Sequence, residues 1–232
     1  MISSRTSAII LRRVNYGEAD RILTLLTRDF GKQALIAKGV RKEKSKLAGG
    51  IELFSESDIS FIKGKSDIGT LVSTQLTRHF GNIHTDLDRM QIASDFLKRV
   101  NNVTEDDASS EYYDIVVDMM IAMNTPAVPP ALVGAWATLR LLLTLGEVIN
   151  VEHDSLGKQF SEEQLYRFSY EEGRFVADPH GAVGPSLIKF MRLLGSESPA
   201  RIMAVKGAEE LGKQAYELLD LAYQYNRPQI KT

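Results

Sequence analysis

Five short apolar runs fill the first 80 residues, and no long helical pattern lies between them. They cover residues 7–13, 21–27, 32–38, 51–63 and 68–76. Asn15 and Gly17 punctuate the first gap, Asp29 and Gly31 the second, and residues 64–67 (GKSD) the last. Short runs at this spacing are typical of strands that close into a small barrel, and five is the strand count of an OB-fold.

From residue 81 the periodicity is that of helices. Apolar side chains recur three or four residues apart, as one buried helix face requires; they are Leu87, Met90, Ala93, Phe96, Leu97 and Val100. Further helices are expected over residues 112–123, 129–145, 185–194 and 199–225, with a short hairpin over 168–176. The sequence therefore predicts an α+β chain. An OB-fold barrel covers residues 1–80 and a mostly helical domain covers 81–232, with an insert at 148–184.

The formal net charge of −2 conceals an uneven distribution. Residues 1–80 hold fourteen lysines and arginines against eight acidic residues, a balance of +6, so the remainder carries −8. A basic module joined to an acidic one suggests two roles and a polyanionic partner for the first. Charge blocks are also common on ordinary solvated surfaces, so charge by itself leaves both interpretations open.

The positive charge is concentrated in residues 31–46, which hold six basic side chains and one acidic one. A loop directly after the third predicted strand would present these cations on one rim of the barrel. Nucleic-acid phosphates favour such a rim, because each neutralised phosphate releases condensed counterions. Bases also stack on aromatic faces of OB-folds. The aromatic candidates are Tyr16, Phe30, Phe54 and Phe61, of which Phe54 and Phe61 have the spacing of core residues.

The same N-terminal residues resemble those of a known family. Residues 8–13 (AIILRR), 16–27 (YGEADRILTLLT), 31–32 (GK), 37–41 (AKGVR), 45–50 (SKLAGG) and 53–54 (LF) are similar, in register, to the N-terminal signature of the RecO family of DNA repair proteins. The resemblance is dense over residues 7–76. It thins afterwards, where residues 136–146 and 168–173 carry it.

This resemblance implies a recombination mediator that is not an enzyme and uses no cofactor. Members bind single- and double-stranded DNA, anneal complementary strands, engage the C-terminal tail of single-strand-binding protein, and act with RecR to load RecA onto coated strands. Carried onto this sequence, the family's DNA-binding character points to Arg12, Lys32, Lys38, Arg41, Lys42, Lys44 and Lys46. The alternative is a generic OB-fold adaptor for single-stranded nucleic acid, with RNA as one of its ligands.

A second candidate surface lies on the helix that contains residues 136–143. Arg140 beside apolar residues such as Leu139 suits a partner's acidic tail that ends in a carboxylate. The leucines of this segment also have the spacing of a bundle core, in which case Arg140 is simply an exposed or paired side chain.

In one respect the sequence departs from the family pattern. Many members carry a four-cysteine zinc module at the position of the insert, but here residues 148–184 contain His153 and His180 and no cysteine. Structural zinc usually needs four nitrogen or sulfur ligands. We therefore expect no metal and a degenerate module held by packing. The packing residues would be Tyr166, Phe168, Tyr170 and Phe175.

Motifs for other functions are incomplete. Residues 64–66 (GKS) mimic the end of a phosphate-binding loop, but Ile59 stands where that loop needs glycine. Glu18 and Asp20 lack the further carboxylates of a magnesium-dependent nuclease, and capping of a turn is the simpler interpretation. The chain has no cysteine, no apolar run near the ~18 residues of a membrane span and no secretory signal at its start. A cytoplasmic, nucleoid-associated protein without a membrane partner is expected.

Overall fold

The computed structural model describes residues 2–64 and 66–226. The chain forms two compact units, Met1–Asn124 and Thr125–Thr232. The first contains five strands and two long helices, and the second contains four helices and a two-stranded sheet. The predicted boundary between an OB-fold domain and a helical domain after residue 80 stays a prediction.

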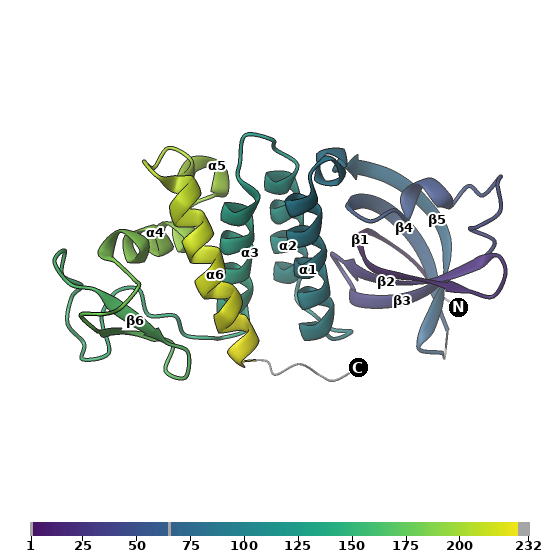
Figure 1. The fold of residues 1–232 in the computed structure, drawn as a ribbon. Helices are drawn as coiled ribbons and strands as arrows, with labels where there is room; N and C mark the ends of the chain where they lie inside the picture. The colour runs from purple at the N-terminus through teal and green to yellow at the C-terminus, as the bar shows by residue number, and fades with distance from the viewer. Residues whose placement is uncertain (1, 65, 227–232) are drawn as a thin grey trace. The chain divides into compact units, whose positions relative to one another are not determined.

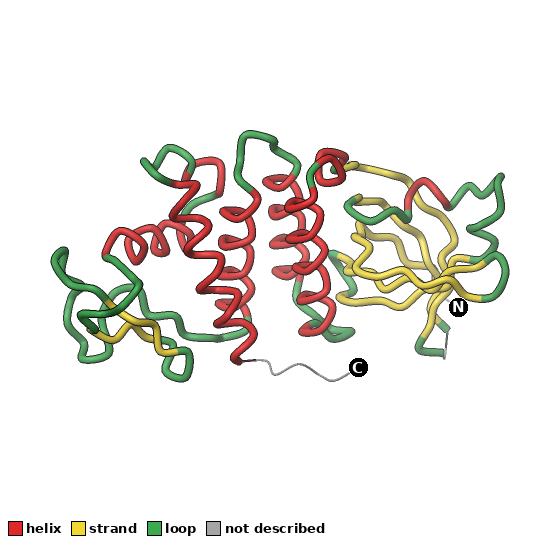
Figure 2. The backbone as a smooth tube through the Cα atoms, in the orientation of Figure 1, coloured by secondary structure: helices red, strands yellow, loops and turns green. Residues whose placement is uncertain are grey.

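The five strands of the first unit close into a barrel in the order β1-β2-β3-β5-β4, and β4 pairs back with β1 (Figure 2). Their bounds are β1 Ile2–Tyr16, β2 Asp20–Thr27, β3 Gly31–Ala37, β4 Ser55–Lys63 and β5 Ile68–His79. β3 and β5 pair in parallel and the other pairs are antiparallel. The closed barrel confirms the predicted OB-fold.

Two strands begin several residues away from their predicted starts, and β5 ends at His79 rather than at residue 76. β4 begins at Ser55 rather than residue 51, because Phe54 adopts a φ of 56°, which a strand does not use. β1 begins at Ile2 rather than residue 7, because its polar first half pairs with β4. A register shift between Ile10 and Arg12 marks the bulge at which β1 leaves β4 behind and continues along β2 alone.

Inward-facing apolar side chains fill the barrel. They come from all five strands and from the loop between β3 and β4, so this loop also closes one end of the core. The buried members are Ala8, Ile10, Leu23, Leu25, Leu35, Ala37, Val40, Ile51, Ile59, Phe61 and Leu71. Burial of this set is the main favourable contribution to the stability of the barrel.

Helices α1 (Leu87–Val103) and α2 (Ser110–Met123) belong to the same unit and lie side by side next to the barrel (Figure 1). α1 follows a short 3-10 helix, η2 (Gly81–Thr85), and is preceded by Asp86, whose Oδ1 accepts the Arg89 N–H at 2.9 Å. This is a normal N-cap. The segment between the helices, residues 104–109, is here called the acidic linker because it contains Glu105, Asp106 and Asp107.

A buried charge couples α2 to the barrel. Glu56, 6% exposed, accepts the Tyr113 hydroxyl at 2.6 Å and the Arg78 Nε–H. Burial raises the pKa of Glu56, but the hydrogen bonds from Arg78 and Tyr113 together lower it below its ordinary 4.5. The unfolded pKa is then the higher of the two. The stabilisation is therefore present above pH 4.5 and is lost as the pH falls through the lowered pKa.

The second unit packs α3 (Pro130–Thr144) against α6 (Ala208–Asn226), with α4 (Pro185–Ser196) and α5 (Pro199–Ile202) beside them. Its small sheet, β6 (Tyr166–Ser169) and β7 (Arg174–Ala177), confirms the predicted hairpin. Phe168 and Phe175 have ring centroids 4.9 Å apart, so aromatic packing does hold the insert. That this insert is a degenerate zinc module stays a prediction.

Among the helices within residues 2–64 and 66–226, not one combines the length and the apolar character that crossing a bilayer requires.

We predict that Tyr113→Phe destabilises the barrel unit by about 1–3 kcal/mol, because buried Glu56 loses one of its donors. Urea unfolding monitored by barrel amide resonances measures the change in the free energy of unfolding. Tyr112→Phe, one position earlier on α2, is the matched control and should change it by less than about 0.5 kcal/mol. Equal effects of the two substitutions would contradict the role of the Glu56 contact.

Candidate nucleic-acid interface

The loop that follows β3 is docked on the turn between β1 and β2. Its Gly39 N–H donates to Asp20 Oδ1 at 2.7 Å, and its Arg41 N–H donates to Ala19 O at 2.9 Å. The Arg41 guanidinium also reaches Gly17 O, at 3.3 Å. Two of these three contacts use backbone donors, so the path of the loop is fixed without using up its lysine side chains.

Local turn geometry explains why the loop follows this path. Gly39 has a φ of 64°, which glycine adopts without the steric penalty that a side chain would bring. Within the loop, Lys42 N–H donates to Gly39 O and Ser45 N–H to Lys42 O, so the chain turns twice in succession. Val40, inside the first of these turns, is 4% exposed; it packs into the barrel core and anchors the loop there.

The cations of this loop are exposed and unpaired. Residues 38–46, here called the basic loop, carry Lys38, Arg41, Lys42, Lys44 and Lys46, all exposed. Among the ion pairs within residues 2–64 and 66–226, none involves these five side chains. The acidic half of the chain therefore does not neutralise them there, and the basic loop is free to meet an external polyanion.

Arg12 and Lys32 lie in different surroundings from each other. Arg12 is exposed on the outer face of β1, opposite Thr24 of β2. Lys32 is half-buried at the far end of β3, where its ammonium donates to Asn101 O at 3.0 Å and to Thr104 O. A cation at the last carbonyls of α1 stabilises that helix end. The structure thus places Lys32 away from the basic loop, and its contact with DNA stays a prediction.

The outer face of the β1-β2-β3 sheet carries apolar side chains, of which only Tyr16 was a candidate from the sequence. In register, Val14 lies opposite Ile22 and Ile22 opposite Ile36. Val14 and Tyr16 are 42% and 55% exposed, and Arg12 shares their face at alternate positions. We call Val14, Tyr16, Ile22 and Ile36 the sheet face. The alternation of residues 12–16 is the sequence signal that would have identified it.

The aromatic candidates divide into two pairs. Phe54 and Phe61 are each 2% exposed and belong to the interior, so they are wrong as stacking platforms. Phe30 is 41% exposed but packs edge-to-face on Phe61 beside the acidic linker, at the start of β3. Tyr16 lies at the β1–β2 turn on which the basic loop rests, so it is the stacking candidate that shares this surface.

Arg140 belongs to the second unit. Its guanidinium carbon lies 5.6 Å from the centroid of the Trp136 ring, a cation–π distance. Its Nε is buried and has no hydrogen-bond partner among the described residues. A buried donor without a partner is uncommon in folded proteins, and an incoming carboxylate would satisfy it. The neighbouring Leu139, Leu141 and Leu142 are buried, as expected for bundle core.

The carboxylates and histidines do not assemble a metal centre within residues 2–64 and 66–226. No three His, Asp or Glu side chains of those residues are grouped so as to hold an ion. Asp20 instead accepts the Gly39 N–H, which makes it an anchor of the basic loop, whereas capping by Glu18 stays a prediction.

Comparison with known proteins gives consistent results. The family model described as Recombination protein O N terminal matches residues 1–80. The DNA repair protein RecO of Acetivibrio thermocellus is 33% identical over 143 residues, 61% of this chain and 57% of that protein. That of Halalkalibacterium halodurans is 28% identical over 82% of this chain and 76% of the relative. That of Bacillus cytotoxicus is 25% identical over 94% and 90%. The match spans only about half the length of two of the relatives, namely 57% of the Acetivibrio thermocellus protein and 51% of the RecO of Heliobacterium modesticaldum.

We predict that Asp20→Ala releases the basic loop, because the Gly39 N–H loses its acceptor. Native-state hydrogen exchange should then be roughly tenfold faster at the Gly39 and Arg41 amides, corresponding to about 1.4 kcal/mol of local stability. Glu18→Ala removes an exposed carboxylate from the same turn and is the matched control. Unchanged protection of both amides in Asp20→Ala would show that the loop is held by something else.

Proposed function

We propose that this chain, whose residues 1–80 match the family model of the RecO N-terminal region, acts as a RecO-type DNA repair protein and is a non-enzymatic recombination mediator. It binds single- and double-stranded DNA, anneals complementary strands, and works with RecR to load RecA onto strands coated by single-strand-binding protein. The observation that carries the proposal is the exposed, unpaired basic loop held on the β1–β2 turn.

Phosphate binding by the basic loop accounts for recognition of both kinds of DNA. Lys38, Arg41, Lys42, Lys44 and Lys46 contact the sugar–phosphate chain, and Arg12 extends the cationic surface along β1. Phosphate contacts carry no base information, so binding is independent of sequence. Each contact releases counterions, so the affinity falls steeply with salt concentration.

The sheet face adds contacts that only a single strand offers. Unpaired bases can lie against Val14, Ile22 and Ile36 and stack on Tyr16, whereas a duplex keeps its bases inside. A strand bound in this way exposes its base edges along a cationic surface. A complementary strand then approaches with less phosphate repulsion, so annealing requires neither metal nor nucleotide. No covalent bond is made or broken.

The partners of this chain follow from the same premise. Arg140 is the proposed contact for the carboxylate end of the single-strand-binding protein tail, because its buried Nε lacks a partner among the described residues. RecR joins the DNA-bound protein, and RecA is engaged indirectly through that assembly.

We predict that neutralising Arg41, Lys42, Lys44 and Lys46 to Gln weakens binding to single-stranded DNA and flattens its salt dependence. Loss of three to four phosphate contacts should reduce the slope of log K against log salt by roughly 2–3. Fluorescence anisotropy with an oligothymidine across a salt series measures both quantities. The matched control neutralises Lys158, Arg174, Lys206 and Lys213, which are equally exposed cations of the second unit.

The same two variants test annealing. Complementary oligonucleotides coated with single-strand-binding protein are mixed without metal or nucleotide, and duplex formation is followed by energy transfer. We expect the native chain and the control to anneal them and the basic-loop variant to fail. Binding without annealing by the native chain would instead favour a generic single-stranded adaptor. An unchanged salt slope in the basic-loop variant would remove the basic loop from the interface.

We predict that Arg140→Gln weakens binding of a peptide with the sequence of the single-strand-binding protein tail by roughly tenfold or more, because a charge-assisted hydrogen bond is lost. Anisotropy of the labelled peptide gives the dissociation constant, and thermal unfolding checks that the variant is folded. Arg201→Gln, an exposed arginine of the same unit, is the control. Equal affinities for Arg140→Gln and Arg201→Gln would place the tail elsewhere.

A further inference from the structure

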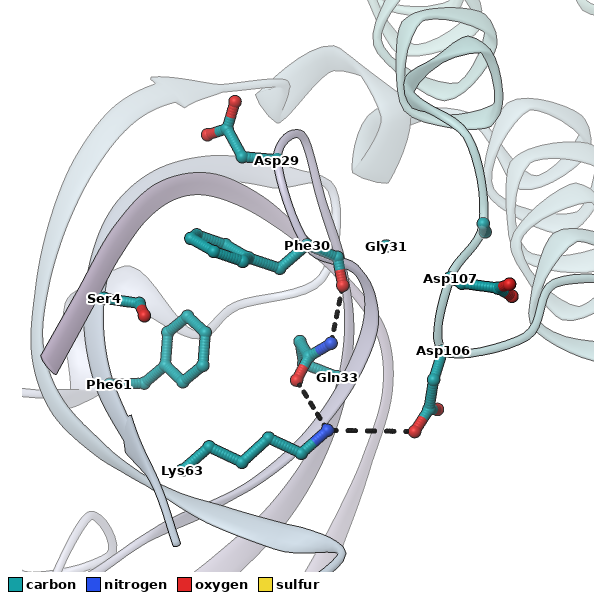
Figure 3. A pocket seen from close by; sticks show the side chains of 10 residues that line it. Ser4, Asp29, Phe30, Gly31, Gln33, Phe61, Lys63, Asp106 and Asp107 are labelled. Atoms are coloured by element: carbon teal, nitrogen blue, oxygen red, sulfur yellow. Dashed lines mark hydrogen bonds and ion pairs between the residues drawn. The ribbon is translucent and has the colours of Figure 1, made fainter. Parts of the chain in front are cut away.

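A cavity of about 480 Å³ opens at the end of the barrel opposite the basic loop (Figure 3). Gly31, the first residue of β3, lines it, while the basic loop begins after Ala37 at the other end of the same strand. Seven residues of strand separate the two ends by roughly 20 Å. The volume lies in the range of ordinary ligand pockets.

One wall of the cavity is aromatic. Phe61 is 2% exposed and its ring packs edge-to-face with that of Phe30, at 5.6 Å and 85°. Phe30 is 41% exposed, so part of its ring remains open to a ligand. The acidic linker lies across from these rings (Figure 3). It rests closely on the β2–β3 turn, since a Cβ at Gly31 would lie 2.4 Å from Asp106 O.

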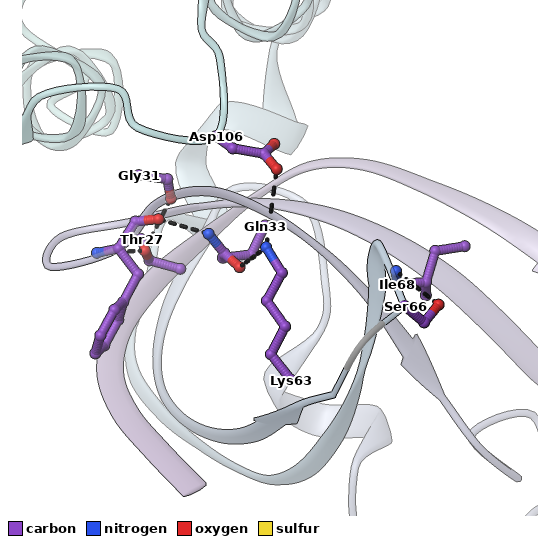
Figure 4. A network of polar contacts seen from close by, with 8 residues as sticks. Thr27, Gly31, Gln33, Lys63, Ser66, Ile68 and Asp106 are labelled. Carbon is purple, nitrogen blue, oxygen red and sulfur yellow. Dashed lines mark hydrogen bonds and ion pairs between the residues drawn. The ribbon is translucent and has the colours of Figure 1, made fainter. Parts of the chain in front are cut away.

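Hydrogen bonds hold this end of the barrel in shape (Figure 4). The Thr27 hydroxyl donates to Gly31 O at 2.8 Å and accepts the Phe30 N–H at 3.1 Å. Gln33 Nε2 donates to Phe30 O at 2.6 Å, and Lys63 Nζ donates to Gln33 Oε1 at 3.2 Å. Phe30 is therefore fixed by its backbone on both sides, and the cavity is formed before any ligand arrives.

The charge at this end is opposite to that of the basic loop. Asp29, Asp106 and Asp107 line the cavity, and Lys63 is the cation among its described lining residues. Lys63 is already held by Asp106, 3.8 Å away, and nearby Arg28 is 3.9 Å from Asp114. The Asp106 carboxylate faces Lys63, whereas those of Asp29 and Asp107 point away from it (Figure 3), and Asp29 also accepts the Thr6 hydroxyl at 2.6 Å. This rim repels phosphates and attracts cations.

We propose that the cavity binds an arginine side chain carried on a basic segment of a partner protein. A guanidinium is planar, so it can lie against an aromatic ring such as Phe30 while it donates to a carboxylate. Asp106 supplies the carboxylate across from that ring, and charge-assisted bonds of this kind are stronger than neutral ones. Because the site is distinct from the basic loop, the interaction does not depend on DNA binding.

The test is a titration of the ¹⁵N-labelled full chain with a capped tetra-arginine peptide at low salt, followed by amide chemical shifts. The largest changes are expected at Phe30, Gly31, Asp106 and Asp107. Asp106→Asn should weaken the peptide's affinity roughly three- to fivefold, as loss of one ion pair predicts. Glu105→Gln removes the same charge from the linker without touching the cavity, and should leave the affinity unchanged. Phe30→Leu should weaken it roughly threefold through loss of the cation–π contact.

Three results would overturn the proposal. Equal losses from Asp106→Asn and Glu105→Gln would mean that the peptide senses only general charge. Shifts confined to residues 125–226 would place the peptide on the second unit. An oligothymidine that moves the cavity amides as strongly as the peptide does would assign the cavity to nucleobases.

Discussion

The hydrogen bonds between the basic loop and the β1–β2 turn determine what the barrel can do. Five cations in nine residues repel one another, and a free loop would spread them through solvent. Asp20 and the carbonyl of Ala19 hold the Gly39 and Arg41 amides, so the loop stays folded on the barrel rim. Since mainly backbone groups make these contacts, the lysine ammonium groups remain available. Order and exposure are thus obtained together, which is what a phosphate-binding surface requires.

The barrel presents different chemistry on each of its surfaces. One part of its outside is covered, where Glu56 binds Tyr113 of α2 and Lys32 reaches the last carbonyls of α1. Another part, the sheet face, stays open beside the cationic rim. The covered part fixes the helices, and the open part is left for a ligand. The closed strand order holds both parts on one framework, because β4 pairs back with β1.

Local patterns were enough to predict the barrel, the hairpin of the insert and the basic loop. Alternating apolar residues and turn glycines are patterns of a few neighbouring residues, so they identify strands and turns without any knowledge of tertiary contacts. Lys32 shows the limit of prediction from local patterns. Its neighbours in sequence are those of the basic segment, but its ammonium binds carbonyls at residues 101 and 104, which no local pattern reveals. The cavity could not be predicted from the sequence for the same reason. Its walls come from segments around residues 30, 61 and 106, which only the closed barrel and the linker bring together.

The seven residues of β3 separate a cationic rim from an anionic mouth, so the barrel carries an electric moment along this strand. A long polyanion that drifts near it feels a torque before any atoms touch, since one pole is drawn in as the other is pushed away. The barrel would therefore meet the polyanion with its cationic rim already facing it, and a larger share of collisions would lead to binding. Raising the ionic strength shortens the reach of this field to a few ångströms and would remove that advantage first.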